Sequence, residues 1–250
     1  YEWGYADRYD EVMAIYHQQI YGIDVAVGMI RKTLEEQGVA ENTVIIYTSD
    51  NGFFCGSHGY GSKVLPYEES SRVPMIIYDP RHPNSGKKMR SDALTGNIDF
   101  APTLLKLAGL PVPENMDGRD LMTLYDDPRA SIHDSLALMN VWGPDPTHAL
   151  SVVTKDMKYI YWSYAAEGFE PAEELYDLKN DPLELTNQAA NSEFSSALQK
   201  MRNVYDRHLA RWKKEAVPHN DYQRFGILFD RSVLWKDKEH LLPASDGKSK

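Results

Sequence analysis

Residues 43–52 read Thr-Val-Ile-Ile-Tyr-Thr-Ser-Asp-Asn-Gly, and this stretch decides the fold that we predict. Its first six residues form a β-branched, apolar run without polar alternation, which is typical of a strand buried on both faces of a parallel sheet. Before it, apolar residues spaced by three and four positions over 9–37 predict a helix that ends at Gly38. A helix, a short turn and a buried strand are half of a doubly wound unit, so we predict an α/β fold.

Four polar or small residues follow this strand directly: Ser49, Asp50, Asn51 and Gly52. Ligands of open α/β sheets gather at the carboxyl ends of the strands, so this position favours a functional site. Asp, Asn and Gly are also the commonest turn formers, so position alone leaves a plain turn open. A glycine-rich loop over residues 52–61 comes next.

The rest of the chain divides near residue 150. Before it we predict a second buried strand, a helix that begins at Asn97 or Asp99, and a long surface connection. After it we predict short antiparallel strands and one covering helix that begins at Ser192. The ranges are 72–78 for the second strand, 111–148 for the connection, and 151–153, 158–162 and 174–178 for the short strands.

The composition fits an ordinary globular protein of 250 residues, long enough for a sizeable core. Its 27 Lys and Arg residues against 37 Asp and Glu residues give a net charge of −10. This charge repels phosphate backbones and anionic lipid, and no apolar run approaches a membrane span of roughly 20 residues. We therefore expect no nucleic-acid partner and no membrane association. The single cysteine excludes an internal disulfide framework and a Cys-rich zinc site.

Two segments carry a resemblance to a known family. Residues 48–63 read Thr-Ser-Asp-Asn-Gly-Phe-Phe-Cys-Gly-Ser-His-Gly-Tyr-Gly-Ser-Lys, and residues 66–74 read Pro-Tyr-Glu-Glu-Ser-Ser-Arg-Val-Pro. Both closely resemble the type I sulfatases, the formylglycine-dependent sulfatases of the alkaline phosphatase superfamily. Further segments resemble the same family in the same order: 21–28, 97–109, 156–160 and 174–184.

The resemblance implies an alkaline phosphatase-like sheet with flanking helices, plus a small C-terminal subdomain of an antiparallel sheet and a helix. We expect residues 1–149 to be the C-terminal part of the catalytic domain and residues 150–216 to be the small subdomain. We expect residues 217–250 to be an extended tail across the surface, with residues 243–250 disordered.

The resemblance also assigns roles in a site. It implies that Asp50 and Asn51 are calcium ligands, and their oxygens suit a hard divalent cation. It places Lys63 on the sulfate as a catalytic and substrate-binding residue, where an ammonium can meet the developing charge. His58 aligns with a histidine frequent in this loop, which can contact the substrate or only pack the loop.

The family nucleophile is a formylglycine made from Cys or Ser in the pattern Cys/Ser-x-Pro/Ala-x-Arg, and no residue of this chain fits that pattern. We expect the nucleophile and the remaining metal ligands in an upstream region, and we expect the 250 residues alone to be inactive. Cys55, followed by Gly-Ser-His-Gly, is expected to be a packed side chain. Glu68 and Glu69 are expected to begin a helical turn, with Arg72 paired to one of them.

The predicted function is hydrolysis of carbohydrate or aryl sulfate esters by a longer chain, with a sulfated small molecule or polysaccharide as substrate. One alternative is a phosphodiester or phosphonate monoester hydrolase of the same superfamily. Another is a noncatalytic module that binds an anionic polysaccharide. Many members of the family are exported, so we expect a periplasmic or secreted protein. Trp142, Trp162 and Tyr164 are candidates for a sugar subsite, although such aromatics more often lie in a core or at its rim.

Overall fold

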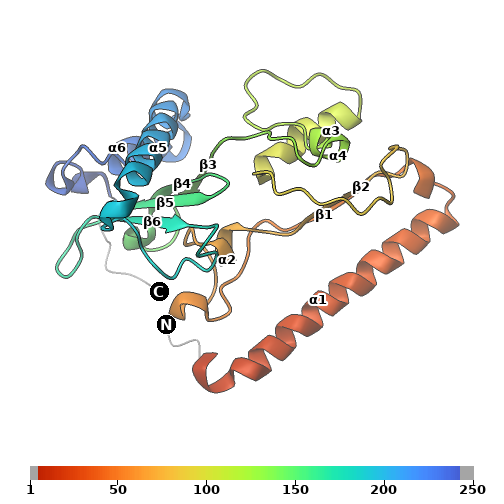
Figure 1. Cartoon of the computed structure of the whole chain (residues 1–250), viewed down its shortest axis with the longest axis horizontal. Coiled ribbons are helices and arrows are strands. Elements are labelled where there is room, and N and C mark those ends of the chain that lie inside the picture. Colours follow the sequence, from red (N-terminus) through yellow and green to blue (C-terminus); the bar gives the residue numbers. More distant parts are fainter. Residues whose placement is uncertain (1–4, 243–250) are drawn as a thin grey trace.

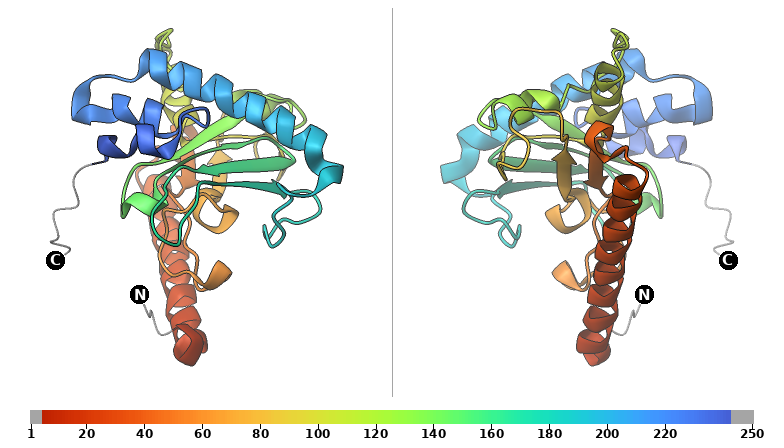
Figure 2. Two further views of the ribbon diagram at one scale, coloured as in Figure 1. Left: turned by 90° about the vertical axis from the view of Figure 1, so that its left-hand side faces the viewer. Right: turned by 90° about the vertical axis from the view of Figure 1, so that its right-hand side faces the viewer.

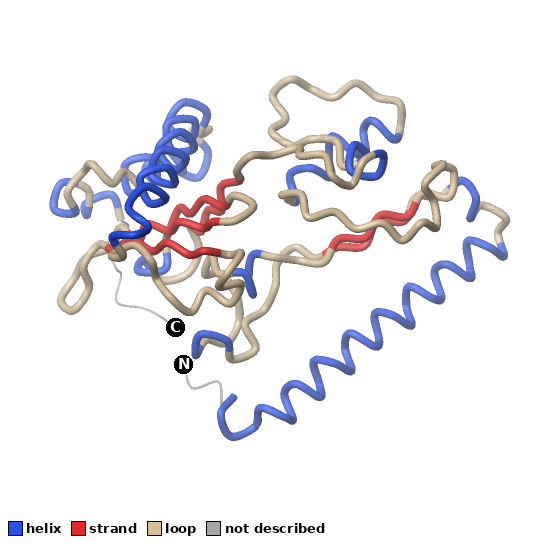
Figure 3. Tube along the Cα trace, in the orientation of Figure 1, coloured by secondary structure: helices blue, strands red, loops and turns tan. Residues whose placement is uncertain are grey.

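A computed structural model describes residues 5–242 of the chain (Figure 1). It contains a two-stranded sheet and a four-stranded sheet, with helices distributed around them (Figure 3). The helices are α1 (Tyr5–Glu36), α2 (Glu68–Ser71), α3 (Phe100–Leu107), α4 (Met122–Asp126), α5 (Ser195–Glu215) and α6 (Phe225–Leu228). The strands are β1 (Ile45–Thr48), β2 (Met75–Tyr78), β3 (Leu136–Asn140), β4 (Ala149–Val153), β5 (Met157–Trp162) and β6 (Ala172–Asp177). Among the described residues, the structure contains no helix with the length and apolar character needed to span a bilayer.

Helix α1 confirms the predicted helix but not its predicted packing. Arg8 leaves the helical region (φ −131°), so the regular helix begins at Tyr9, where the apolar stripe begins. Figure 1 shows α1 running away from the four-stranded sheet, and both views of Figure 2 show its N-terminal half projecting beyond the rest of the molecule. Apolar residues of its stripe are exposed, Ile30 by 56%. Tyr16 stacks on Phe53 with ring centroids 6.5 Å apart. The helix, the turn and the strand follow one another as predicted, but among the described residues the sheet of two short strands leaves most of α1 uncovered.

Strands β1 and β2 confirm the two predicted strands, but they pair antiparallel, Ile45 opposite Tyr78 and Thr48 opposite Met75. Two neighbouring parallel strands need a crossover connection between them, which is usually an α-helix. The segment between these strands contains only a 3₁₀ turn (Ser57–Gly59) and the four-residue helix α2, and the chain returns beside β1 in the opposite direction. The expectation of a parallel strand buried on both faces is therefore wrong, and all residues of β1 are half-buried.

Helix α3 begins where the sequence predicts, after a 3₁₀ turn over Asn97–Asp99. Asp99 is fully buried, and its carboxylate accepts from the amides of Gly96 (2.8 Å) and Arg119 (2.7 Å). The His133 Nε2 atom lies 2.8 Å from the same carboxylate. This one side chain fixes the 3₁₀ turn that carries Asn97.

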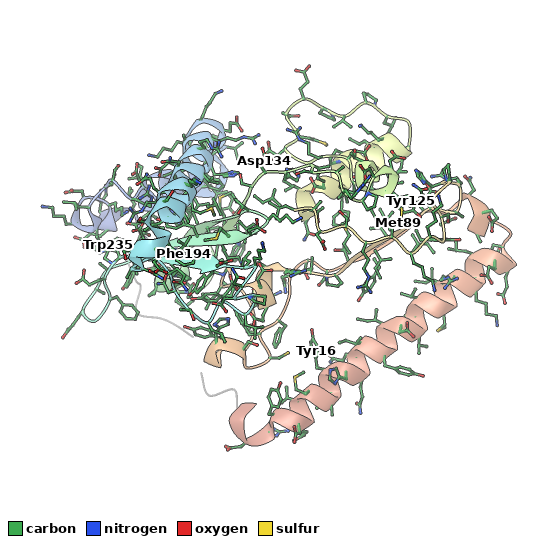
Figure 4. The ribbon with its side chains drawn as sticks, viewed as in Figure 1. Tyr16, Met89, Tyr125, Asp134, Phe194 and Trp235 are labelled. Atoms are coloured by element: carbon green, nitrogen blue, oxygen red, sulfur yellow. The ribbon has the colours of Figure 1, made fainter. Side chains whose placement is uncertain are left out.

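The four-stranded sheet has the order β3-β4-β5-β6, and every neighbouring pair is antiparallel. Helix α5 covers one face, and Figure 4 shows side chains crowded there and sparse along α1. The core on that face contains Leu150, Val152, Tyr159, Tyr161, Leu175, Leu198, Met201, Tyr205 and Leu209. The opposite face packs against the loop that follows β1, through Phe54, Tyr67, Ile160 and Tyr176.

The four-stranded sheet crosses the expected boundary at residue 150, because β3 pairs with β4. Residues 136–140 therefore lie in the sheet and not in a surface connection, and α4 interrupts that connection as well.

The segment after residue 217 also differs from the prediction. It folds into short helices and inserts Phe225, Leu228 and Phe229 into the core, each at most 2% exposed. It is therefore not an extended surface tail within residues 217–242, because large aromatic side chains are most stable when buried. The predicted disorder of residues 243–250 lies outside the described residues.

Candidate functional site

The turn that follows β1 carries Asp50 and Asn51 and is held by its own polar groups. The Asn51 amide donates to Asp50 Oδ1 at 2.9 Å, and the Ser49 hydroxyl donates to the Asn51 carbonyl at 2.8 Å. Asn97 Nδ2 donates to the Asp50 carbonyl at 3.0 Å. The Asp50 side chain is exposed and Asn51 is half-buried. Both oxygen-bearing groups thus sit on a fixed backbone at the end of a strand.

Lys63 lies against this turn. Its Nζ atom donates to Asn51 Oδ1 at 2.9 Å across twelve positions of sequence. The structure therefore brings together two of the residues that the sequence singled out, one with an oxygen donor and one with a positive charge. An exposed ammonium beside oxygen donors is an arrangement that can bind an anionic ester group.

The short helix α2 binds both the turn of Asn51 and the loop of Lys63. Ser70 accepts from the Gly52 amide through its carbonyl (2.8 Å) and from the Val64 amide through its hydroxyl (3.0 Å). A Cβ atom at Gly52 would lie 2.0 Å from the Glu69 carbonyl oxygen, so only glycine allows this approach. The turn of Asn51 and the loop of Lys63 are thus both fastened to α2.

His58 packs within the loop. Its ring stacks on Tyr67 with centroids 4.6 Å apart, and its Nε2 atom lies 3.4 Å from Glu69 Oε2. The side chain is 13% exposed. His58 has left-handed backbone (φ 56°), as has Cys55 (φ 50°), so this loop is tightly turned.

A buried ionic cluster joins α2 to the four-stranded sheet. Lys158 Nζ lies 2.9 Å from Glu184 Oε1 and 2.8 Å from Glu68 Oε1. Glu184 Oε2 accepts from the Glu68 amide at 2.5 Å. Burial raises the pKa of Glu184, against the opposing effect of the Lys158 charge. Removal of one member would leave a buried charge uncompensated, so these groups hold their positions together.

The remaining candidates of the sequence lie in the following surroundings. Burial raises the pKa of the Cys55 thiol, which disfavours the reactive thiolate. Glu68 begins the helical turn α2, and Arg72 Nη1 lies 3.7 Å from Glu68 Oε2. Of the aromatic candidates for a sugar subsite, Trp142 is 73% exposed. The ring of Tyr164 packs against that of Trp235, with the ring centroids 5.2 Å apart.

Two sets of side chains can be considered for a metal ion. Asp50 and Asn51 offer a carboxylate and an amide oxygen, the donors that hard cations prefer, although calcium takes about 6–8 oxygens. The second set is His58, Glu69 and Glu184, whose ligand atoms lie within 4.8 Å of one another. There the ammonium of Lys158 already compensates Glu184, which disfavours a second cation. The oxygens of Asp50 and Asn51 fit a hard cation, and a cation there would take the place of the exposed Lys63 ammonium at Asn51 Oδ1.

The sequence reasoning missed the residues that hold the site in place. Ser70, Lys158 and Glu184 lie in segments that resemble the family, yet nothing in their spacing indicates their contacts. The Glu184–Glu68 bond spans 116 positions. Asn97 was expected at the start of a helix, and its contact with Asp50 spans 47 positions.

Two family models match the chain. The model described as N-sulphoglucosamine sulphohydrolase, C-terminal, matches residues 56–211, and the model described as sulfatase matches residues 1–110. The first covers more than half of the chain, and together they include every residue of the site described above.

Relatives agree with these matches. The chain is 32% identical over 197 residues to an arylsulfatase of Clostridium perfringens, covering 78% of this chain and 40% of the relative. It is 30% identical over 212 residues to an N-acetylglucosamine-6-O-sulfatase of Bacteroides thetaiotaomicron, covering 82% and 37%. The chain thus spans about two fifths of the length of these curated relatives.

Solved structures agree as well. One, of a protein in complex with its substrate D-glucosamine-2-N,6-O-disulfate, matches with a TM-score of 0.70 at 27% identity, over 80% of this chain and 41% of that one. The phosphonate monoester hydrolase of Agrobacterium radiobacter matches with a TM-score of 0.64 at 25% identity, over 82% and 42%. The fold is therefore that of the alkaline phosphatase-like sulfatases. From the family models, the relatives and the fold together, the chain belongs to the type I sulfatase family of the alkaline phosphatase superfamily.

Proposed function

We propose that the protein containing this chain hydrolyses sulfate esters, and that this chain supplies two metal ligands, Asp50 and Asn51, and a sulfate-binding catalytic lysine, Lys63. The observation that carries the proposal is the 2.9 Å contact between Lys63 Nζ and Asn51 Oδ1. Such a contact puts a positive charge and an oxygen ligand within reach of one ester group.

Hydrolysis of a sulfate ester requires positive charge beside the ester group. Cleavage of a sulfate ester increases the negative charge on the nonbridging oxygens and on the leaving oxygen. The Lys63 ammonium would bind a sulfate oxygen and stabilise the leaving oxygen as its charge grows. A hard cation, when bound, supplies Lewis-acid stabilisation of the same charge. The turn at Asp50 and Asn51 would orient its two oxygens toward that cation.

We propose calcium as the metal, since a carboxylate and an amide oxygen are hard donors and calcium takes several of them. Further ligands have to complete the shell, because two donors are too few. For His58, the substrate contact implied by the family resemblance stays a proposal. Its stacking on Tyr67 and small exposed fraction favour a role in holding the loop.

We propose a carbohydrate or aryl sulfate as the substrate. The named activities of the two relatives, arylsulfatase and N-acetylglucosamine-6-O-sulfatase, support this class. So does the sulfated glucosamine bound by the structural neighbour. We propose a formylglycine nucleophile outside these 250 residues, because no Cys or Ser here has the required neighbours. The proposed location is periplasmic or secreted, by analogy with exported sulfatases.

Hydrolysis of a phosphonate monoester is the second candidate, because a phosphonate monoester hydrolase shares the fold at 25% identity. Paired rates on an aryl sulfate and an aryl phosphonate monoester, measured with the full-length protein, separate the two. We expect the higher kcat/KM on the sulfate. A higher value on the phosphonate would favour the second candidate, and inactivity on both would contradict each of them.

The metal is tested in the same assay. We expect a chelator to abolish the activity and added calcium to restore it. In the variant Asp50→Ala, we expect kcat to fall by about 10²–10³, the usual effect of losing such charge stabilisation. Activity that a chelator leaves unchanged would contradict the metal assignment.

A further inference from the structure

The backbone on both sides of Lys63 is strained. Ser62 has φ 68° and Val64 has φ 101°, both in the left-handed region. A β-branched residue such as valine is strongly disfavoured there, because its side chain collides with the backbone. Such a conformation persists only where the surrounding structure holds it. The loop that presents Lys63 therefore depends on contacts that keep it strained.

Ser70 supplies such contacts. Its hydroxyl accepts from the amide of Val64, next to Lys63, and its carbonyl accepts from the amide of Gly52, next to Asn51. Ser70 is only 5% exposed, so water competes little for either bond. One buried residue thus fixes the backbone beside both members of the site.

Helix α2, which carries Ser70, is itself held from the four-stranded sheet. Four residues are far too few for a stable isolated helix. Glu184 accepts from the first amide of α2, and Lys158 contacts Glu184, the Glu68 carboxylate and, at 3.3 Å, the Ser71 hydroxyl. The side chains of Lys158 and Glu184 are fully buried. These contacts lie on the face of the sheet opposite α5.

We propose that Ser70 is a positioning residue that holds Lys63 against Asn51, and that the buried pair of Glu184 and Lys158 fixes the helical turn that carries it. The inference rests on the proposed function, in which Lys63 and Asn51 act on the same ester. Ser70 acts through the backbones of residues 52 and 64. The C-terminal sheet is thereby part of the machinery that orients the site.

The test uses the full-length protein with the variants Ser70→Ala and Ser70→Thr, assayed on an aryl sulfate. Misplacement of a group by about 1 Å can cost a hundredfold in rate, so we expect Ser70→Ala to lower kcat roughly ten- to hundredfold. We expect the calcium concentration for half-maximal activity to stay within about threefold of the wild-type value, because the variant keeps the Ser70 carbonyl that accepts from the Gly52 amide. Ser70→Thr keeps the hydroxyl acceptor and is expected to retain kcat within about threefold.

A pair of glutamate variants separates positioning from stability. Glu184→Ala removes the carboxylate that holds α2, whereas Glu173→Ala removes one from β6 that binds Arg202. Each variant is assayed at a temperature that lies the same number of degrees below the midpoint of its own thermal unfolding. We expect kcat to fall in Glu184→Ala and to stay at the wild-type value in Glu173→Ala.

The outcomes distinguish this inference from the proposed function. A wild-type kcat in Ser70→Ala, in an active enzyme, overturns the positioning role and leaves the function standing. Equal losses in Ser70→Ala and Glu173→Ala also overturn it, because they would reflect stability alone. Should Glu184→Ala fail to fold, Ser70→Ala with its threonine rescue decides. A wild-type protein inactive on sulfate esters overturns both.

Discussion

At the scale of single residues, Gly52 is the position where the site tolerates least change. Its Cα lies against the Glu69 carbonyl, which a Cβ would approach to 2.0 Å. The backbone oxygen cannot rotate away as a side chain could, so a larger residue has to push Asn51 away from α2. The geometry of the turn at Asp50 and Asn51 and the packing of α2 thus both depend on the absence of a side chain at Gly52.

We therefore expect Gly52→Ala to destabilise the protein by about 1–3 kcal/mol, the usual cost of overpacking. The matched control is Gly28→Ala on α1, where a Cβ meets nothing within 4 Å. There alanine is expected to stabilise the helix by about 0.5–1 kcal/mol. Thermal unfolding of the two variants checks this contrast. Equal effects of the two substitutions would contradict the close approach.

Asp230 predicts an acid sensitivity. Burial raises its pKa, but hydrogen bonds from Lys213 and Ser232 outweigh burial and lower the pKa from 3.8 to about 2. A lowered folded-state pKa means that the carboxylate stabilises the fold above about pH 4 and that this stability is lost as the pH falls toward 2.

The contribution is about 1–2 kcal/mol, because a tenfold difference in proton affinity between the folded and unfolded states corresponds to about 1.4 kcal/mol and the carboxylate is partly exposed. Urea unfolding between pH 5 and pH 2 measures it. We expect Asp230→Asn to lower the stability at pH 5 and to flatten its decline with acid. A decline as steep as in the wild type would show that Asp230 plays no such part.

The sequence indicates some residues of the candidate site and not others. Asp50, Asn51 and Lys63 could be singled out as candidates because all three lie in one continuous motif. Glu184 could not be predicted, because its hydrogen bond to the Glu68 amide spans 116 positions and leaves no periodic signal in the sequence. Ser70 could not be predicted either, because it binds backbone amides, which every residue type except proline carries.

At the scale of elements, the segment after α5 is an integral part of the C-terminal unit. Phe229 is 1% exposed, and its carbonyl accepts from the buried Tyr205 hydroxyl at 2.6 Å. Its ring stacks on Phe225 with centroids 5.5 Å apart. The segment therefore closes the core on the α5 side of the sheet.

We expect Phe229→Ala to cost about 3–5 kcal/mol, as for other buried aromatics. Phe169→Ala is the control, because that ring is 54% exposed and its loss is expected to change stability by less than about 0.5 kcal/mol. Denaturant unfolding compares them. A small loss in Phe229→Ala would mean that the segment only lies on the surface.

A local sequence pattern predicts whether a segment is a helix or a strand, but not which strand it pairs with. The stripe over 9–37 and the β-branched run over 43–48 predicted α1 and β1 correctly as a helix and a strand. The direction of β2 was not predictable, because an apolar run indicates burial and not the partner. Strand β3 was missed because its surroundings are rich in Pro, Asp and Gly, which resemble a loop.

At the scale of the whole molecule, the site lies on a bridge between two sheets. The loop over 53–67 leaves β1 and packs on the four-stranded sheet through Phe54 and Tyr67. The turn at Asp50 and Asn51 thus follows a strand of the two-stranded sheet, whereas the loop that carries Lys63 packs on the four-stranded sheet. The relative position of the two sheets fixes the site.

We expect these 250 residues alone not to hydrolyse sulfate esters. None of their Cys or Ser residues lies in the sequence pattern from which the family makes its formylglycine nucleophile. The measurement is the release of phenol from an aryl sulfate by the purified chain. The chain with Lys63→Ala serves as its control. Turnover above that control would show that another residue of this chain acts as the nucleophile.

The most direct test compares two lysines that each donate to an asparagine amide oxygen. Lys63 Nζ lies 2.9 Å from Asn51 Oδ1, and Lys87 Nζ lies 2.6 Å from Asn84 Oδ1. In the full-length protein, kcat on an aryl sulfate is measured for Lys63→Ala and Lys87→Ala. We expect a loss of about 10²–10³ for Lys63→Ala and wild-type kcat for Lys87→Ala. Near-normal kcat in Lys63→Ala would contradict a shared site of Asp50, Asn51 and Lys63.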